Sequence, residues 1–167
     1  TDAKELMNIS MLTNAFSPQK NISREEFLEF KSNWLIKNAD LDLIENYLIK
    51  NKIINSHTKL TKYFLDENLS MANVEEACEL FKKNLEAIND EYISKYNIYC
   101  LIRDNKIEEA QLIYDLKKEL GLKDEYFEKK ISYLFNFSPK IDEAISEKSI
   151  FDFYLAHQTN PNFSFEP

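Results

Sequence analysis

The chain has 167 residues, enough for one domain with its own core or for a segment of a longer array. It contains one glycine and four prolines, and 21 Lys and Arg against 29 Asp and Glu give a net charge of −8. A single glycine excludes the dinucleotide and P-loop fingerprints, which each need more than one. The acidic balance opposes nucleic acids and anionic membranes, which are bound mainly by basic side chains. We therefore expect neither nucleic-acid binding nor membrane insertion.

Hydrophobic spacing and capping residues predict four helices in the first half of the chain. They cover residues 3–16, 24–38, 41–50 and 57–65, and the last is expected to fray near residues 66–68. A turn at Pro18 separates the first two. The expected N-caps are Ser23, in a capping box with Glu26, then Asp40 and Ser56. The side chains expected to face inward are Leu6, Ile9, Leu12, Phe27, Phe30, Trp34, Leu41, Ile44, Leu48, Leu60, Tyr63 and Phe64.

The second half shows the same kind of signal, which weakens after Phe137. The expected helices are residues 74–85, 91–102, 107–120 and 125–134, then the shorter 141–145 and 150–156. The expected N-caps are Asn73, Asp90, Asp124 and Ser149. The side chains expected to face inward are Ala77, Cys78, Phe81, Leu85, Ile113, Leu116, Leu120, Phe127, Ile131 and Leu134. Gly121 stands where a left-handed residue ends a helix.

These elements predict an all-α protein of antiparallel helical hairpins. We expect residues 1–157 to form a single helical-repeat domain, with a candidate sub-boundary near residues 69–72. Residues 158–167 should form an extended tail, because they contain two prolines. Its aromatic side chains, Phe163 and Phe165, either dock onto a groove or belong to a linker into a following domain.

Two sequence patterns return after about 33 residues. Residues 74–77 (Val-Glu-Glu-Ala) return as residues 107–110 (Ile-Glu-Glu-Ala), and Asp-Glu-Tyr returns at residues 124–126 after residues 90–92. Stretch 73–136 therefore resembles the tetratricopeptide-like α-solenoids, whose repeat is about 34 residues. The resemblance implies a right-handed stack of hairpins that binds a protein or peptide on its concave face. Hairpins stack because one alone cannot bury its apolar face.

The sequence gives no pattern of a catalytic, metal or cofactor site, and we expect none of the three. Acidic pairs such as Glu75 and Glu76 lie in first helical turns, where they favour the helix dipole. His57 and His157 lack metal-site spacing, and we interpret them as surface residues. Cys78 and Cys100 lie on apolar stripes, so we interpret them as reduced core cysteines; a bridge between adjacent helices is the alternative.

Tyr92, Tyr96 and Tyr99 form the candidate partner-binding site, because tyrosines give rigid contact area with a polar tip. The preferred alternative is that they pack between hairpins. The expected function is a protein- or peptide-binding module without catalytic activity. Two other functions stay open: a helical accessory domain of a larger enzyme, such as a cell-wall lyase, and an acidic inhibitor or antitoxin. We recognise no signal peptide or membrane span, so we expect a soluble chain; its compartment and oligomeric state do not follow from the sequence.

Overall fold

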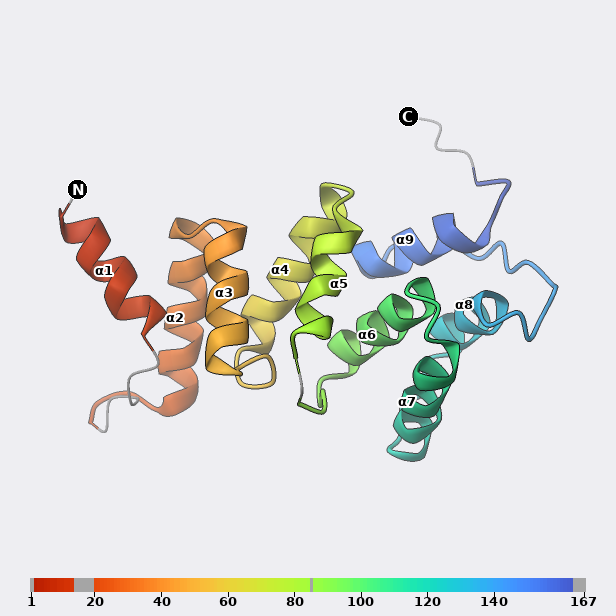
Figure 1. The fold of residues 1–167 in the computed structure, drawn as a ribbon, viewed down its shortest axis with the longest axis horizontal. Helices are drawn as coiled ribbons and strands as arrows, with labels where there is room; N and C mark the ends of the chain where they lie inside the picture. The colour runs from red at the N-terminus through yellow and green to blue at the C-terminus, as the bar shows by residue number, and fades with distance from the viewer. Residues whose placement is uncertain (1, 14–19, 85, 164–167) are drawn as a thin grey trace. The chain divides into compact units, whose positions relative to one another are not determined.

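The structure, a computed structural model, describes residues 2–13, 20–84 and 86–163. Within these residues it contains nine α-helices and no β-strand, which confirms the expected all-α fold (Figure 1). The helices are α1 (Asp2–Leu12), α2 (Arg24–Asn38), α3 (Leu41–Asn51), α4 (Thr58–Ser70), α5 (Val74–Lys82), α6 (Glu91–Arg103), α7 (Ile107–Glu119), α8 (Glu125–Leu134) and α9 (Ile150–Thr159). The expectations for Pro18, Leu85 and Phe165 lie outside the described residues.

The chain divides into two compact units. The first comprises residues 1–68 and 75–90, and it holds α1, α2 and α3 with most of α4 and α5. The second comprises residues 69–74 and 91–167, and it holds α6 to α9. In the first unit α1 packs against α2. In the second unit α6 packs against both α7 and α8, and α8 packs against α9.

Short polar side chains fix where several helices begin. Ser23 accepts a hydrogen bond from the Glu26 amide at 3.1 Å, and the Glu26 carboxylate accepts one from the Ser23 amide at 2.8 Å. This is the predicted capping box. The other confirmed caps are Asp40, Asp124 and Ser149, each of which accepts from the amide three residues on. Helix α4 begins at Thr58, so Ser56 lies two residues before it and one residue outside the cap position, and the Ser56 amide donates to the Ile53 carbonyl in a turn.

Gly121 ends α7 as its sequence position predicts. Its φ is +106°, which a residue with a Cβ adopts only under strain. The Gly121 amide donates to the Lys118 carbonyl, and the Leu122 amide donates to the Lys117 carbonyl. These two bonds form a Schellman motif, which satisfies carbonyls that the end of the helix would otherwise leave without a partner.

Many predicted core positions are confirmed. The buried ones are Ile44, Leu48, Leu60, Phe64, Ala77, Cys78, Phe81, Phe127 and Ile131. Two helices of the first unit bury other faces than predicted: Leu6 and Ile9 of α1 are exposed, as is Phe30 of α2, whereas Leu35 is fully buried. Apolar spacing reveals a helix, but a neighbouring helix decides which of two adjoining stripes is buried.

Five predictions of where a helix lies are wrong. Helix α1 ends at Leu12 instead of residue 16, and α5 ends at Lys82 instead of residue 85. Helix α4 does not fray near residues 66–68 but continues to Ser70, and the Asn68 side-chain amide donates to the Phe64 carbonyl at 2.9 Å. Residues 141–145 are not helical, since the Asp142 carbonyl accepts from the Lys130 ammonium and its carboxylate accepts from the Ala144 amide. Those bonds replace the helical ones. Helix α9 extends to Thr159 instead of Ala156.

Cys78 and Cys100 are both buried, as predicted, but neither is a free thiol. Both are disulfide-bonded, so the interpretation as reduced cysteines is wrong. Phe163, in the described part of the tail, lies edge-on against Phe153 and His157 of α9, with ring centroids 5.4 and 5.6 Å apart. Phe163 therefore docks onto the helix that precedes it.

Candidate functional site

The tyrosines of α6 pack against α9. The Tyr96 ring stacks on the Phe151 ring, with centroids 4.5 Å apart and planes 19° apart. Tyr92 and Tyr99 meet the same Phe151 ring edge-on, at 6.0 and 5.9 Å. Tyr96 is fully buried, Tyr99 is 5% exposed and Tyr92 is half-buried. This placement favours packing over partner binding for the three tyrosines.

A hydroxyl pair closes this aromatic cluster. The Tyr99 and Tyr154 hydroxyl oxygens are 3.0 Å apart, so one donates to the other. Burial and this hydrogen bond raise the pKa of Tyr99 above its ordinary value. Tyr99 therefore stays neutral around pH 7 and joins α6 to α9.

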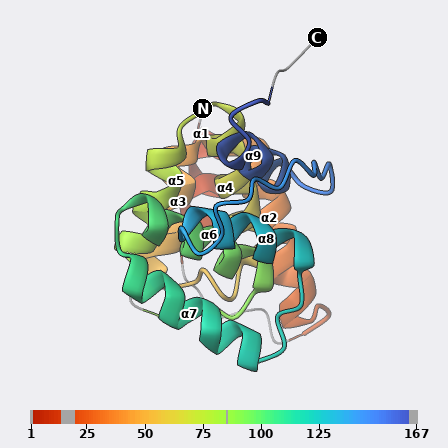
Figure 2. The ribbon, with the colours of Figure 1, turned by 90° about the vertical axis from the view of Figure 1, so that its right-hand side faces the viewer.

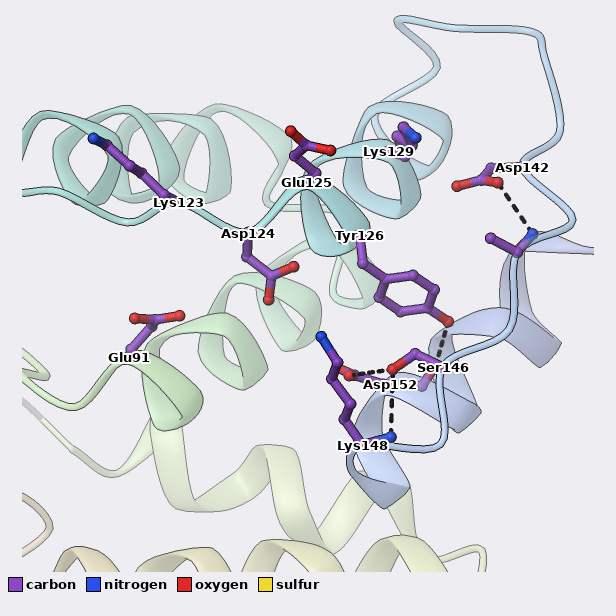
Figure 3. Close-up of a pocket in the computed structure, with 11 residues that line it drawn as sticks. Glu91, Lys123, Asp124, Glu125, Tyr126, Lys129, Asp142, Ser146, Lys148 and Asp152 are labelled. Carbon is purple, nitrogen blue, oxygen red and sulfur yellow. Dashed lines mark hydrogen bonds between the residues drawn. The ribbon is translucent and has the colours of Figure 1, made fainter.

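A polar pocket of about 490 Å³ opens in the second unit, where the start of α8 faces residues 142–148 and the start of α9. Figure 3 shows Asp124 and Tyr126 pointing from α8 toward Ser146, Lys148 and Asp152. The acidic residues that line it are Glu91, Asp124, Glu125, Asp142 and Asp152, and the basic ones are Lys123, Lys129 and Lys148.

The innermost polar groups of this pocket hold the fold together. Asp124 caps α8 and also accepts from the Lys95 ammonium of α6 at 2.7 Å. Burial would raise the pKa of Asp124, but hydrogen bonds from Lys95 and from the Phe127 amide lower it below its ordinary value.

The opposite wall of the pocket is tied in the same way. Asp152 accepts from the Ser146 hydroxyl at 2.8 Å, and the Tyr126 hydroxyl donates to the Asp152 carbonyl at 2.8 Å. Burial raises the pKa of Tyr126 to about 12, so its hydroxyl keeps its proton at neutral pH. These contacts connect α8 to α9 through residues 142–148, so the groups that make them stabilise the fold.

A buried polar cluster around His57 lies in the first unit. The Ser32 hydroxyl is 3.2 Å from His57 Nδ1, and the Tyr47 hydroxyl is 3.3 Å from His57 Nε2. Burial, helped by the nearby Lys31 and Arg24 cations, lowers the pKa of His57 to about 4. His57 is only 4% exposed, so the prediction of a surface histidine is wrong.

The His57 cluster pairs a hydroxyl with an imidazole, as a nucleophile and its base are paired. Ser32 and Tyr47 are 2% and 3% exposed, however, so a substrate has no access to either. The cluster satisfies buried polar groups. Sequence reasoning missed it because its three members come from separate elements and no motif links them.

An exposed row of leucines runs along α7. Leu112, Leu116 and Leu120 are spaced four residues apart and are 70%, 51% and 73% exposed. Residues four apart lie on one face of a helix, so the three side chains adjoin one another. We name Leu112, Leu116 and Leu120 the leucine row. The prediction that Leu116 and Leu120 face inward is wrong, since α7 buries Ala110 and Tyr114 instead.

Carboxylates border the leucine row on one side. Asp115 and Glu119 are exposed and lie on the same flank, Asp115 three residues after Leu112 and Glu119 three residues after Leu116. We name these two residues the acidic row. In Figure 2, α7 is seen along most of its length. Helix α7 thus carries two parallel rows, one apolar and one acidic, on its exposed side.

No group of three or more His, Cys, Asp or Glu among residues 2–13, 20–84 and 86–163 is arranged to hold a metal ion. In the same residues, no helix combines the length and hydropathy that crossing a membrane requires. Comparisons of the chain with protein-family models, with curated proteins and with solved structures found no match.

Proposed function

We propose that this chain is a protein- or peptide-binding module of tetratricopeptide-like helical hairpins, stacked as a right-handed solenoid and without catalytic activity of its own. The leucine row of α7 carries the proposal. Single exposed leucines are common on protein surfaces, whereas adjoining ones typically mark an interaction site. In α7 three of them follow one another on one face, each more than half exposed.

Helix positions support the repeat part of the proposal. Helix α7 begins 33 residues after α5, and α8 begins 34 residues after α6. Equivalent positions are buried alike, since Ala77 and Ala110 are both inaccessible to solvent. A hairpin unit of this length agrees with the period of tetratricopeptide-like repeats.

A site-specific photo-crosslinker tests the binding function. p-Benzoylphenylalanine replaces Leu116 in the full chain, and in a matched control it replaces Phe30, which is 49% exposed on α2. Irradiation in the source cell should give a discrete protein adduct from position 116 that position 30 does not give. Adducts that are absent, or identical from both positions, would count against the leucine row as a binding face.

A further inference from the structure

We infer that the segment bound by α7 is an amphipathic helix whose apolar stripe is bordered on one side by Lys or Arg. This inference rests on the proposed function and names the chemistry of its partner. It follows from three features of α7: the length of the leucine row, the engagement of its backbone, and the position of the acidic row.

The length of the leucine row suits a helix of the partner. Leu112 and Leu120 are eight residues apart, which is about 12 Å along the axis at about 1.5 Å per residue. A partner helix lying along α7 presents apolar side chains at i, i+4 and i+7 over the same length. Leu112, Leu116 and Leu120 thus match one stripe of about two turns.

The backbone of α7 excludes the main alternative, an added β-strand. Strand addition needs a row of amides and carbonyls at a sheet edge. In α7 the backbone groups bond within the helix, and its C-terminal carbonyls are engaged by Gly121 and Leu122. Only side chains are available for contact on the exposed face.

The acidic row favours a partner with positive charge. Asp115 and Glu119 lie along one flank of the leucine row and are exposed. An acidic or neutral partner would bring like charges together or leave these carboxylates without a counterion, whereas Lys or Arg would pair with them. The net charge of −8 acts in the same direction, since it attracts a basic segment from a distance.

A second copy of the chain fits this face less well. Each copy carries a net charge of −8, so two copies repel one another. An antiparallel pair of α7 helices with a two-fold axis would also set both acidic rows on the same side, facing each other. A separate, basic partner avoids both costs.

A peptide display selection tests the inference without assuming the charge. The probe is a library of 20-residue peptides with Leu at i, i+4, i+7 and i+11 and random residues at the flanking positions. The library is first depleted of peptides that bind the variant Leu112→Gln, Leu116→Gln, Leu120→Gln. Peptides that bind the full chain are then selected. We expect the enriched peptides to carry Lys or Arg along one flank of the leucines.

Charge reversal then tests the acidic row directly. With a synthetic enriched peptide, the variant Asp115→Lys, Glu119→Lys should bind about tenfold more weakly, which corresponds to two exposed ion pairs. The matched control reverses two exposed acids elsewhere, Glu5 and Glu143, to Lys and should bind like the parent. A peptide with its basic residues changed to Glu should recover binding to the α7 variant, which also shows that this variant is folded.

The outcomes separate the inference from the proposed function. Enriched peptides with neutral or acidic flanks that need the leucine row overturn the inference and leave the binding function standing. Peptides that bind the leucine variant as well as the parent, or no enrichment at all, overturn both. Self-association of the parent that the leucine variant loses, measured by sedimentation, would assign the face to a second copy and overturn the inference.

Discussion

The Tyr96 ring of α6 stacks on the Phe151 ring of α9, and both side chains are fully buried. Phe151 also meets Tyr92, Tyr99 and Phe127, so it is the centre of the aromatic cluster of the second unit. The tyrosine stripe of α6 therefore packs against α9, whose Phe151 lies 55 residues after Tyr96, in agreement with the alternative preferred from the sequence.

Removing the Phe151 ring should destabilise the second unit strongly. Phe151→Ala leaves a cavity under three tyrosines, and we expect a loss of about 3–5 kcal/mol in the free energy of unfolding. Ile150→Ala is the matched control, because Ile150 is 37% exposed on the same helix, and it should cost less than about 1 kcal/mol. Urea unfolding followed by circular dichroism measures both. Equal losses of unfolding free energy in the two variants would mean that Phe151 does not hold α9 against the tyrosines.

His57 should make stability depend on pH below neutrality. Its pKa is about 4 in the folded chain against 6.5 ordinarily, so the unfolded chain takes up this proton first as the pH falls. The contribution of His57 is complete above pH 6.5, is lost as the pH falls toward 4, and amounts to about 3 kcal/mol at most. His57→Gln should flatten the unfolding free energy between pH 6.5 and 4. The matched control is His157→Gln, which removes the exposed histidine and keeps His57.

Asp124 should matter more than an ordinary helix cap. Both Asp40 and Asp124 cap a helix, but only Asp124 also holds the Lys95 ammonium, whose side chain is 10% exposed. Asp40→Ala should cost about 1 kcal/mol as a lost cap. Asp124→Ala should cost at least about 2 kcal/mol, because it also leaves a largely buried cation without its carboxylate. Similar losses in denaturant unfolding would show that the Lys95 pair adds nothing.

The leucine row should contribute little to folding. Leu112→Gln, Leu116→Gln and Leu120→Gln exchange exposed side chains for one that also favours helix, so each should change the unfolding free energy by less than about 0.5 kcal/mol. Tyr114→Ala, on the buried face of the same helix, should cost about 3 kcal/mol. Thermal and urea unfolding measure both. A large loss at the leucines would place them in a contact within the chain.

Local signals predicted helices and their ends well, because they act over three or four residues. Ser23 with Glu26, Asp40, Asp124, Ser149 and Gly121 all occupy the cap positions that their types indicate. The helix predicted for residues 141–145 does not form, because the Lys130 ammonium, twelve positions earlier, binds the Asp142 carbonyl that a helix would use. Such a contact leaves no trace in local spacing.

The sequence by itself determined that this protein is helical, where most of its helices start and stop, and that it is acidic. Only the tertiary structure decided which face of each helix is buried. The tyrosines of α6 pack against Phe151, and α7 buries Tyr114 and leaves its leucines exposed. The physical reason is that helix formation depends on hydrogen bonds and caps within one segment, whereas burial depends on the shape of another. The candidate site on α7 therefore became visible only in the folded chain.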